Sequence, residues 1–310
     1  MKRRRPPPRI PNRIPPVLES EAPGLLELER FSQASLGQWS AAQRNLRELH
    51  QAFFFALEQQ RQAHSAELIE ALRAHASAGE LFTQWSRIID YRYSEAPLSV
   101  AGSLRRGGRF NIGADIDAAT FTPFPALYIA EDYPTAFRER FGADEAATGR
   151  LSTQELALRT PASFTHVALR GQLELVIDVG ASHTLAAFAR VLSRFVIPST
   201  VRALARRLAI QRPLQLVRSV SGLYRQLLHP HWRAEPTQFD LPANSQVFGR
   251  IAASAGLHGI LYPSARHASG RCLALFPQNW KGSTSFIEIL GGAPSQARLI
   301  RIDGTTAELE

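Results

Sequence analysis

The segment from Val167 to Val179 constrains the fold more than any other stretch, because apolar and polar residues alternate along it. This alternation is typical of a β-strand with one buried face. Gly171 interrupts the apolar face and predicts a turn or a bulge there. A strand needs partners, and shorter runs of similar character predict them at 87–93, 128–130, 259–262, 271–276 and 286–290.

Helical patterns lie on both sides of this strand. Between Ser40 and Ser77, apolar residues recur at helical spacing and predict one long helix or two shorter ones. The stretch from Ser40 to Gln43 matches a capping box and predicts the helix start. The residues that carry the spacing are Leu46, Leu49, Phe53, Leu57, Leu68 and Leu72.

Three further helical regions follow. Pro134 suits the first turn of a helix that is capped by Asp132 or Tyr133 and ends near Gly142. Residues 184–230 are predicted to be mostly helical, and another helix is predicted to start at Asn244 or Ser245 and to stop at Gly256. The chain therefore combines predicted strands with predicted helices, and we expect an α+β fold.

The chain length of 310 residues and the 45% hydrophobic content allow one large domain or two small ones. We expect a basic, proline-rich tail at 1–24 and a helical extension at 25–85. The main domain is expected at 86–292, with a helical insertion at 184–235, and a C-terminal tail at 293–310.

The formal net charge is +9, and the basic tail contributes part of it. Weak contact of this tail with nucleic acid is one interpretation, and a solvated tail is the favoured one. The single cysteine, Cys272, excludes a disulfide framework and a cysteine-rich metal site, so we expect no metal. No apolar run suits a signal peptide or a membrane span, so we expect a cytoplasmic protein without membrane contact.

The stretch from Tyr91 to Glu139 collects the residues most suited to chemistry. Arg92 and Arg109 lie near a glycine pair, and guanidinium groups match phosphate oxygens where glycine lets the backbone approach. Tyr93 and Tyr128 offer flat faces to a ring, and the carboxylate of Glu139 can stabilise a cation or bind ribose hydroxyls. These groups suit a nucleotide diphosphate with a labile glycosidic bond. From the residues alone, surface positions or ion pairs with Glu139 remain the alternative.

The order of several motifs resembles the RES domain, a family named for arginine, glutamate and serine. The resemblance covers residues 88–280 discontinuously and rests on these segments: Tyr91-Arg92-Tyr93, Gly107-Gly108-Arg109-Phe110-Asn111, Leu127-Tyr128-Ile129-Ala130, Glu139, Ser245-Gln246-Val247-Phe248-Gly249, the run from Gly256 through Ser264 to Arg266, and Cys272 to Phe276. The family pattern favours tryptophan where this chain has Phe110, and the segment between Arg109 and Tyr128 is longer than usual.

The resemblance implies an ADP-ribosyltransferase-like mixed β-sheet core with surrounding helices and a cleft for NAD. RES proteins are toxins of bacterial toxin–antitoxin pairs that consume NAD by hydrolysis or phosphorolysis, or transfer ADP-ribose to a protein. An Xre-type helix-turn-helix antitoxin usually covers their active site. The extra segments 25–85 and 184–235 would then act as a built-in cover, as a homo-oligomer surface, or in another role.

Carried over residue by residue, the resemblance implies that Arg92 and Arg109 bind the phosphates of NAD. Tyr93 and Tyr128 would line the nicotinamide–ribose pocket. Glu139 would orient the ribose and stabilise an oxocarbenium-like transition state, as carboxylates do at other glycosidic bonds.

Ser264 would hydrogen-bond the ribose or a phosphate. Glu131 is the alternative to Glu139 as the active carboxylate, and Arg266 is an alternative phosphate ligand or a salt-bridge partner. His258 and His267 flank Ser264, but the sequence around this serine lacks the Gly-x-Ser-x-Gly elbow, which argues against a hydrolase triad.

The sequence therefore predicts an NAD glycohydrolase or phosphorylase that acts as a toxin. The first alternative is an ADP-ribosyltransferase that modifies a protein. The second is a non-catalytic interaction module whose basic tail contacts nucleic acid.

Overall fold

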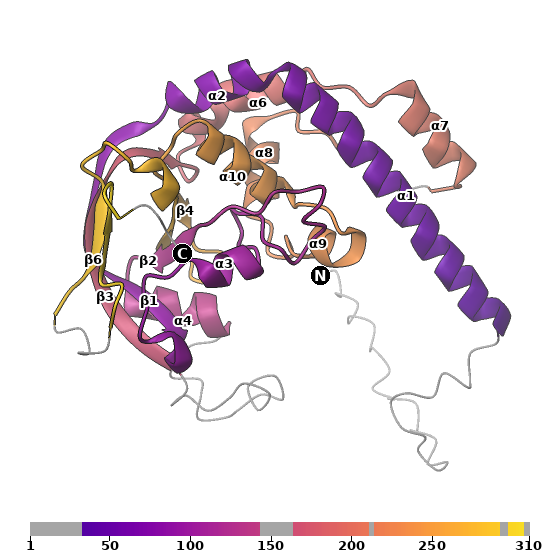
Figure 1. The fold of residues 1–310 in the computed structure, drawn as a ribbon. Helices are drawn as coiled ribbons and strands as arrows, with labels where there is room; N and C mark the ends of the chain where they lie inside the picture. The colour runs from indigo at the N-terminus through magenta and orange to yellow at the C-terminus, as the bar shows by residue number, and fades with distance from the viewer. Residues whose placement is uncertain (1–32, 143–163, 211–213, 292–296, 307–310) are drawn as a thin grey trace, which may run out of the picture. The chain divides into compact units, whose positions relative to one another are not determined.

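The computed structural model describes residues 33–142, 164–210, 214–291 and 297–306 (Figure 1). The chain divides into two units, Met1–Leu46 and Arg47–Glu310. The predicted tail at 1–24 lies outside the described residues, and residues 33–46 are the described part of the first unit.

Two helices occupy the predicted N-terminal helical region: α1 (Gln33–Ala63) and α2 (Ser65–Arg73). The two-helix version of the prediction is confirmed. The helix start predicted at Ser40 is wrong, because α1 already starts at Gln33 and no proline lies between Gln33 and Ser40. The part of α1 that belongs to the second unit is fixed to the domain, since the Gln60 amide exchanges hydrogen bonds of 2.8 and 2.9 Å with the backbone of Val196.

In the described part of the chain, seven strands form one sheet in the order β1-β2-β5-β4-β3-β6-β7. They are β1 (Ser77–Asp90), β2 (Leu127–Ala130), β3 (Phe164–Asp178), β4 (Gly259–Pro263), β5 (Arg271–Leu275), β6 (Phe286–Ile289) and β7 (Arg301–Asp303). β3 and β4 are parallel and the other pairs are antiparallel, so the sheet is mixed. Because β1 pairs with both β2 and β3, five strands close on themselves. β7 lies within the segment predicted as a tail.

The predicted strand at 87–93 is the end of a longer strand. β1 begins at Ser77 and stops at Asp90, and Tyr91–Tyr93 form a turn of 3₁₀ helix. The register of β1 against β3 shifts between Phe82 and Trp85, where Gln84 has a φ of 61°. Such a bulge changes which residues of a strand face a given side.

β3 confirms the predicted strand at 167–179, and the bulge predicted at Gly171 is found in the partner strand, where the β1 register shifts directly beyond the Phe82–Gly171 pair. Gly171 pairs with Phe82 on one side and Ile287 on the other. A Cβ atom there would lie 2.3 Å from the backbone oxygen of Phe286. Glycine is therefore needed for the close approach of β6.

The remaining helices are α3 (Ala101–Arg105), α4 (Tyr133–Phe141), α6 (Ala186–Ser193), α7 (Ser199–Arg207), α8 (Val220–Leu227), α9 (Ala234–Phe239) and α10 (Asn244–Ser254). The helix predicted at Pro134 is confirmed, because Asp132 accepts from the backbone N–H of Thr135 at 2.7 Å and Gly142 ends α4 in a left-handed conformation. The predicted cap of α10 is wrong by one residue. Ala243 is the N-cap, and its N–H donates to the side chain of Gln246 at 3.0 Å.

Two apolar clusters pack against the sheet. Helices α2, α6, α8 and α10 gather over one face (Figure 1), and Leu72, Phe188 and Phe248 pack there with strand residues such as Ile260. The second cluster includes Phe82, Trp85, Leu273, Trp280 and Ile302. The α+β prediction, with surrounding helices and an N-terminal helical extension, is confirmed. Within the described ranges, no helix is long and apolar enough to span a membrane.

Candidate active-site cleft

A cleft of about 380 Å³ opens beside α4, between the end of β1, strand β2, the Gly108–Arg109 loop and residues 230–233. The residues that line it are Ser86, Arg87, Ile88, Gly108, Arg109, Tyr128, Ile129, Ala130, Ala136, Glu139, Arg140, Pro230, Trp232, Arg233, Tyr262, Ala265, Arg266 and Cys272. Several of them belong to the apolar cluster under the helices, so the cleft is a gap at the edge of the core.

Tyr128 holds the glycine loop in place. Its hydroxyl donates to Oδ1 of Asn111 at 2.9 Å and accepts from the backbone N–H of Phe110 at 2.9 Å. The same Asn111 oxygen accepts from the N–H of Gly108 at 2.8 Å. A Cβ atom on Gly108 would lie 2.3 Å from the Tyr128 hydroxyl, so glycine is required at this position. Burial raises the pKa of Tyr128, which keeps the hydroxyl protonated and able to donate.

Helix α10 supports this loop from the core side. The Gln246 amide donates to the carbonyl oxygens of Gly108 and Asn111 at 3.1 and 3.0 Å. A Cβ atom on Gly249 would lie 1.9 Å from the carbonyl oxygen of Phe110. The segment from Ser245 to Gly249 therefore positions the loop and does not line the cleft.

Arg109 brings a buried positive charge to the cleft. Its side chain is 9% exposed, and Nη1 donates to the carbonyl oxygens of Leu227 and His229 at 3.2 and 3.0 Å. No carboxylate forms an ion pair with it among the described residues. Carbonyl oxygens fix the guanidinium without neutralising it, so its charge is available to an anion.

Arg87 supplies a second such charge, and the sequence analysis missed it. It donates to the carbonyl oxygens of Tyr128 and Ser99 at 3.2 and 3.1 Å. Its buried Nε has no hydrogen-bond partner among the described residues. Burial lowers the pKa of Arg87 to about 10, so the group is still protonated at neutral pH. A buried donor without a partner is costly, and the same side chain lines the cleft.

Arg92 and Tyr93 are not brought into the cleft. Arg92 lies on the 3₁₀ turn after β1, donates to Asp90 at 3.4 Å and lies 4.7 Å from the centre of the Tyr93 ring. Its side chain is 62% exposed. The structure thus gathers Arg109, Tyr128 and Glu139 of the predicted set in one cleft, with Ser264 directly behind it and the other two residues outside.

Ser264 and Glu139 form a pair at the end of α4. The hydroxyl of Ser264 donates to Oε1 of Glu139 at 2.5 Å, and the N–H of Ala265 donates to the same oxygen at 3.1 Å. The Ser264 oxygen in turn accepts from the backbone N–H groups of Arg266 and His267 at 3.1 and 2.9 Å. These contacts fix the carboxylate while it still lines the cleft.

The side chains weighed as alternatives have other partners. Glu131 lies outside the cleft and pairs with Arg271 at 2.7 Å, and the hydrogen bond from Arg271 lowers the pKa of Glu131. His258 contacts the hydroxyl of Ser285 and His267 contacts the hydroxyl of Thr135, each at 2.7 Å. Since the Ser264 hydroxyl donates to a carboxylate, the structure shows no Ser-His nucleophile pair at this serine.

Arg266 lines the cleft and forms no salt bridge with another described residue. Its Nη1 donates to the carbonyl oxygens of Arg138 and Glu139 at 3.4 and 3.2 Å, which suits the carbonyl end of a helix.

The cleft is strongly electropositive. Among the residues that the structure describes, one lining carboxylate, Glu139, faces five lining arginines: Arg87, Arg109, Arg140, Arg233 and Arg266. Arg140 is paired with Asp90, and Arg233 lies 3.9 Å from Asp115. The remaining charge favours an anionic ligand with more than one negative charge.

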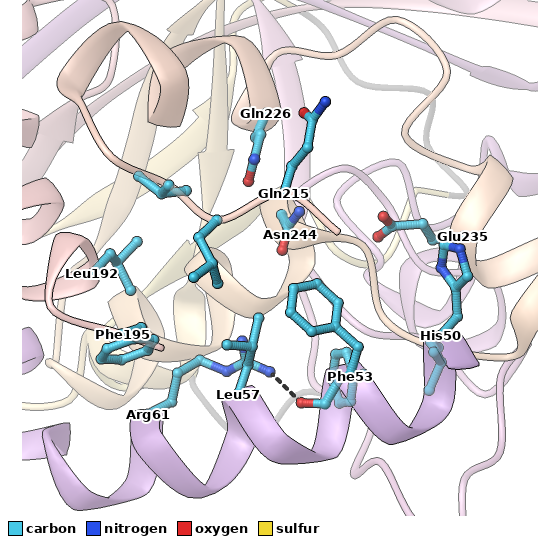
Figure 2. Close-up of a pocket in the computed structure, with 14 residues that line it drawn as sticks. His50, Phe53, Leu57, Arg61, Leu192, Phe195, Gln215, Gln226, Glu235 and Asn244 are labelled. Atoms are coloured by element: carbon cyan, nitrogen blue, oxygen red, sulfur yellow. Dashed lines mark hydrogen bonds between the residues drawn. The ribbon is translucent and has the colours of Figure 1, made fainter. Parts of the chain in front are cut away.

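A second, smaller cavity of about 90 Å³ lies away from these residues (Figure 2). Its walls are largely apolar and include Phe53 and Leu57 of α1. Its arginine, Arg61, is paired with Glu58 at 2.8 Å, so the cavity does not offer a free cation. The larger cleft is therefore the candidate active site.

Cys272 lies at the bottom of the cleft and is 2% exposed. Burial raises its thiol pKa, so we expect almost no thiolate in the folded protein. A thiol-specific chromogenic reagent should modify Cys272 only after denaturant is added. Rapid stoichiometric labelling of the native protein would contradict the described burial.

The fold and the cleft define an α+β protein with an arginine-rich cleft that holds a fixed carboxylate. The family model described as "RES domain" matches residues 84–223 and 180–295, so the chain belongs to the RES domain family. It is also similar to a chain in the crystal structure of the M. tuberculosis MbcT–MbcA toxin–antitoxin complex. That match has 16% identity and a TM-score of 0.37, and it covers 78% of this chain and 96% of the other. No curated protein sequence matches the chain.

Proposed function

We propose that this protein cleaves the bond between nicotinamide and ribose in NAD. The observation that carries the proposal is the arrangement of two arginines held by backbone carbonyl groups, Arg87 and Arg109, in one cleft with the fixed carboxylate of Glu139. Membership of the RES family supports NAD as the substrate.

The arginines would bind the pyrophosphate. Arg109 is held by two carbonyl oxygens, and Arg87 has an Nε without a partner in the described structure. A pyrophosphate would satisfy that donor and balance part of the cleft's charge. Arg87 thus takes the role that the family resemblance gave to Arg92, while Arg109 keeps its role.

Glu139 would face the bond that breaks. As the C1′–N bond opens, its electron pair leaves with nicotinamide, whose ring becomes neutral, and positive charge develops on the ribose. A fixed carboxylate stabilises that charge, which is worth ~2.7–4 kcal/mol for comparable preorganised groups. Ser264 acts as a positioning residue, since its hydroxyl holds Glu139 at 2.5 Å.

The reaction needs no strong acid, because nicotinamide in NAD is already a cationic leaving group. An acceptor oxygen then bonds to C1′ and loses its proton. We take water or phosphate as the acceptor, which makes the enzyme a glycohydrolase or a phosphorylase. Among the described residues, no group of three or more His, Cys, Asp or Glu side chains is arranged to hold a metal.

The proposed biological role is that of a toxin which depletes NAD and is held inactive by a partner antitoxin. Family membership supports this role. The five arginines that line the cleft would also suit an acidic segment of such a partner.

The test is to incubate the purified full chain with NAD, with and without inorganic phosphate, and to separate the products. Free nicotinamide with ADP-ribose indicates hydrolysis, and a phosphorylated ADP-ribose that appears only with phosphate indicates phosphorolysis. Nicotinamide together with a labelled protein would indicate an ADP-ribosyltransferase. Folded protein, free of bound inhibitor, that releases no nicotinamide would contradict the proposal and favour a non-catalytic module.

A further inference from the structure

The segment 227–233, which follows α8, forms one wall of the cleft. It lies in the predicted helical insertion, and Pro230, Trp232 and Arg233 line the cleft. Trp232 is half-buried and belongs to neither of the two apolar clusters. An aromatic ring that lines a cleft without serving the core needs another explanation.

The wall is fixed to the loop that contains Gly107, Gly108 and Arg109 by two arginines. Arg109 donates to the carbonyl oxygens of Leu227 and His229 at 3.2 and 3.0 Å. In the reverse direction, Arg233 donates to the carbonyl oxygen of Gly107 at 2.8 Å. The Trp232 ring is therefore held at a defined place beside Arg109, and a ligand would meet it without a large rearrangement.

Both guanidinium groups lie close to the ring of Trp232. The central carbon of Arg233 is 4.3 Å from the ring centroid, and that of Arg109 is 5.8 Å away. Cations near an indole face are attracted by its electrons, so the two guanidinium groups help to hold the ring and place positive charge beside it. Glu139, the one lining carboxylate among the described residues, comes from α4 instead.

This charge distribution distinguishes the two ends of a dinucleotide. The nicotinamide ring of NAD is a cation and is disfavoured beside two guanidinium groups. The adenine ring is neutral and can stack on an indole or a guanidinium plane. We propose that Trp232 is the platform on which the adenine ring stacks, so that the substrate extends from Glu139 past Arg87 and Arg109 to the 227–233 segment. This inference rests on the proposed function and adds the direction of the substrate and a specificity-determining residue.

The test measures binding of two probes that lack nicotinamide, ADP-ribose and inorganic pyrophosphate, by titration calorimetry. For Trp232→Ala, we expect the Kd of ADP-ribose to rise about tenfold, as for loss of one base–aromatic stack. The Kd of pyrophosphate should change by less than about twofold, because the two arginines remain. Trp232→Phe should recover most of the ADP-ribose affinity.

Two outcomes would overturn the inference. Equal weakening of both probes means that Trp232 only positions Arg109, and no weakening of either means that the base lies elsewhere. Absence of ADP-ribose binding to the wild-type protein also rejects it. Failure of the proposed reaction can be told apart from failure of this inference. A protein that binds ADP-ribose through Trp232 but releases no nicotinamide from NAD would keep the adenine site and reject the proposed enzyme activity. Melting temperatures of the variants show whether they are folded.

Discussion

Replacing Glu139 with glutamine should lower kcat for nicotinamide release by about 100- to 1000-fold, because the variant loses the charge that stabilises the oxocarbenium-like transition state. The amide keeps the shape of the side chain and can still accept from Ser264 and Ala265, which hold the carboxylate in the wild type. We therefore expect the Kd of NAD to change by less than about threefold. Single-turnover kinetics would separate the chemical step from binding.

Glu131→Gln is the matched control. This residue is the alternative carboxylate, lies outside the cleft and forms an exposed ion pair with Arg271. Exposed ion pairs contribute little to stability, so nicotinamide release should stay within about twofold of wild type. If Glu131→Gln loses activity and Glu139→Gln keeps it, the roles of the two carboxylates must be exchanged.

Replacing Arg87 with methionine should weaken NAD binding about 100-fold, because removal of one partner of a buried, hydrogen-bonded charge contact costs about 2–5 kcal/mol. Methionine keeps much of the apolar stem, so the change mainly removes the charge. The variant also leaves the carbonyl oxygens of Ser99 and Tyr128 without the Arg87 donor, which should lower the melting temperature modestly. The Kd of NAD and the melting temperature are the two measurements.

The variant Arg92→Met tests whether Arg87 or Arg92 binds the phosphates of NAD. The structure favours Arg87, and the family resemblance implied Arg92. The Arg92 side chain is 62% exposed, and its ion-pair partner is Asp90 at 3.4 Å. We expect the Kd of NAD to stay within about twofold of wild type, as for most surface substitutions. A larger loss in Arg92→Met than in Arg87→Met would return the phosphate role to Arg92.

The parts of the fold that the sequence predicts well are those with local signals. β3 follows from alternation along a single strand, and α4 follows from Asp132, Pro134 and Gly142, which mark its start and its end. The helix of Glu139 was predictable from these signals, the family resemblance supplied its expected role, and the structure places it at the cleft. Ser264 could be predicted as a site residue, but its hydrogen bond to a carboxylate 125 residues away could not.

Arg87 shows what local patterns do not specify. The residue lies between Trp85 and Ile88 on a strand that enters the core, and a charge at such a position was a usable signal. The neighbouring motif Tyr91-Arg92-Tyr93 matched the family pattern, so the phosphate-binding role was assigned to Arg92 instead. The side that a β1 residue faces depends on the bulge near Gln84, and this bulge is set by pairing with β3 about 80 residues later in the chain.

Trp232 and Arg233 had no sequence signal at all. They reach the cleft through contacts between the 227–233 segment and a loop more than 100 residues earlier, such as that between Arg109 and Leu227. Loops of this kind follow no periodic pattern, so their contribution to a site becomes visible only in the folded structure.

The order of the strands has a consequence for protein synthesis. β2 carries Tyr128 into the cleft and pairs along its whole length with β5, the strand of Cys272. β5 leaves the ribosome long after the residues that would bind phosphate. A nascent chain that ends before β5 cannot complete the cleft, and under the proposed function such a chain would consume no NAD. Translation itself would therefore delay toxicity until the residues through β5 have emerged.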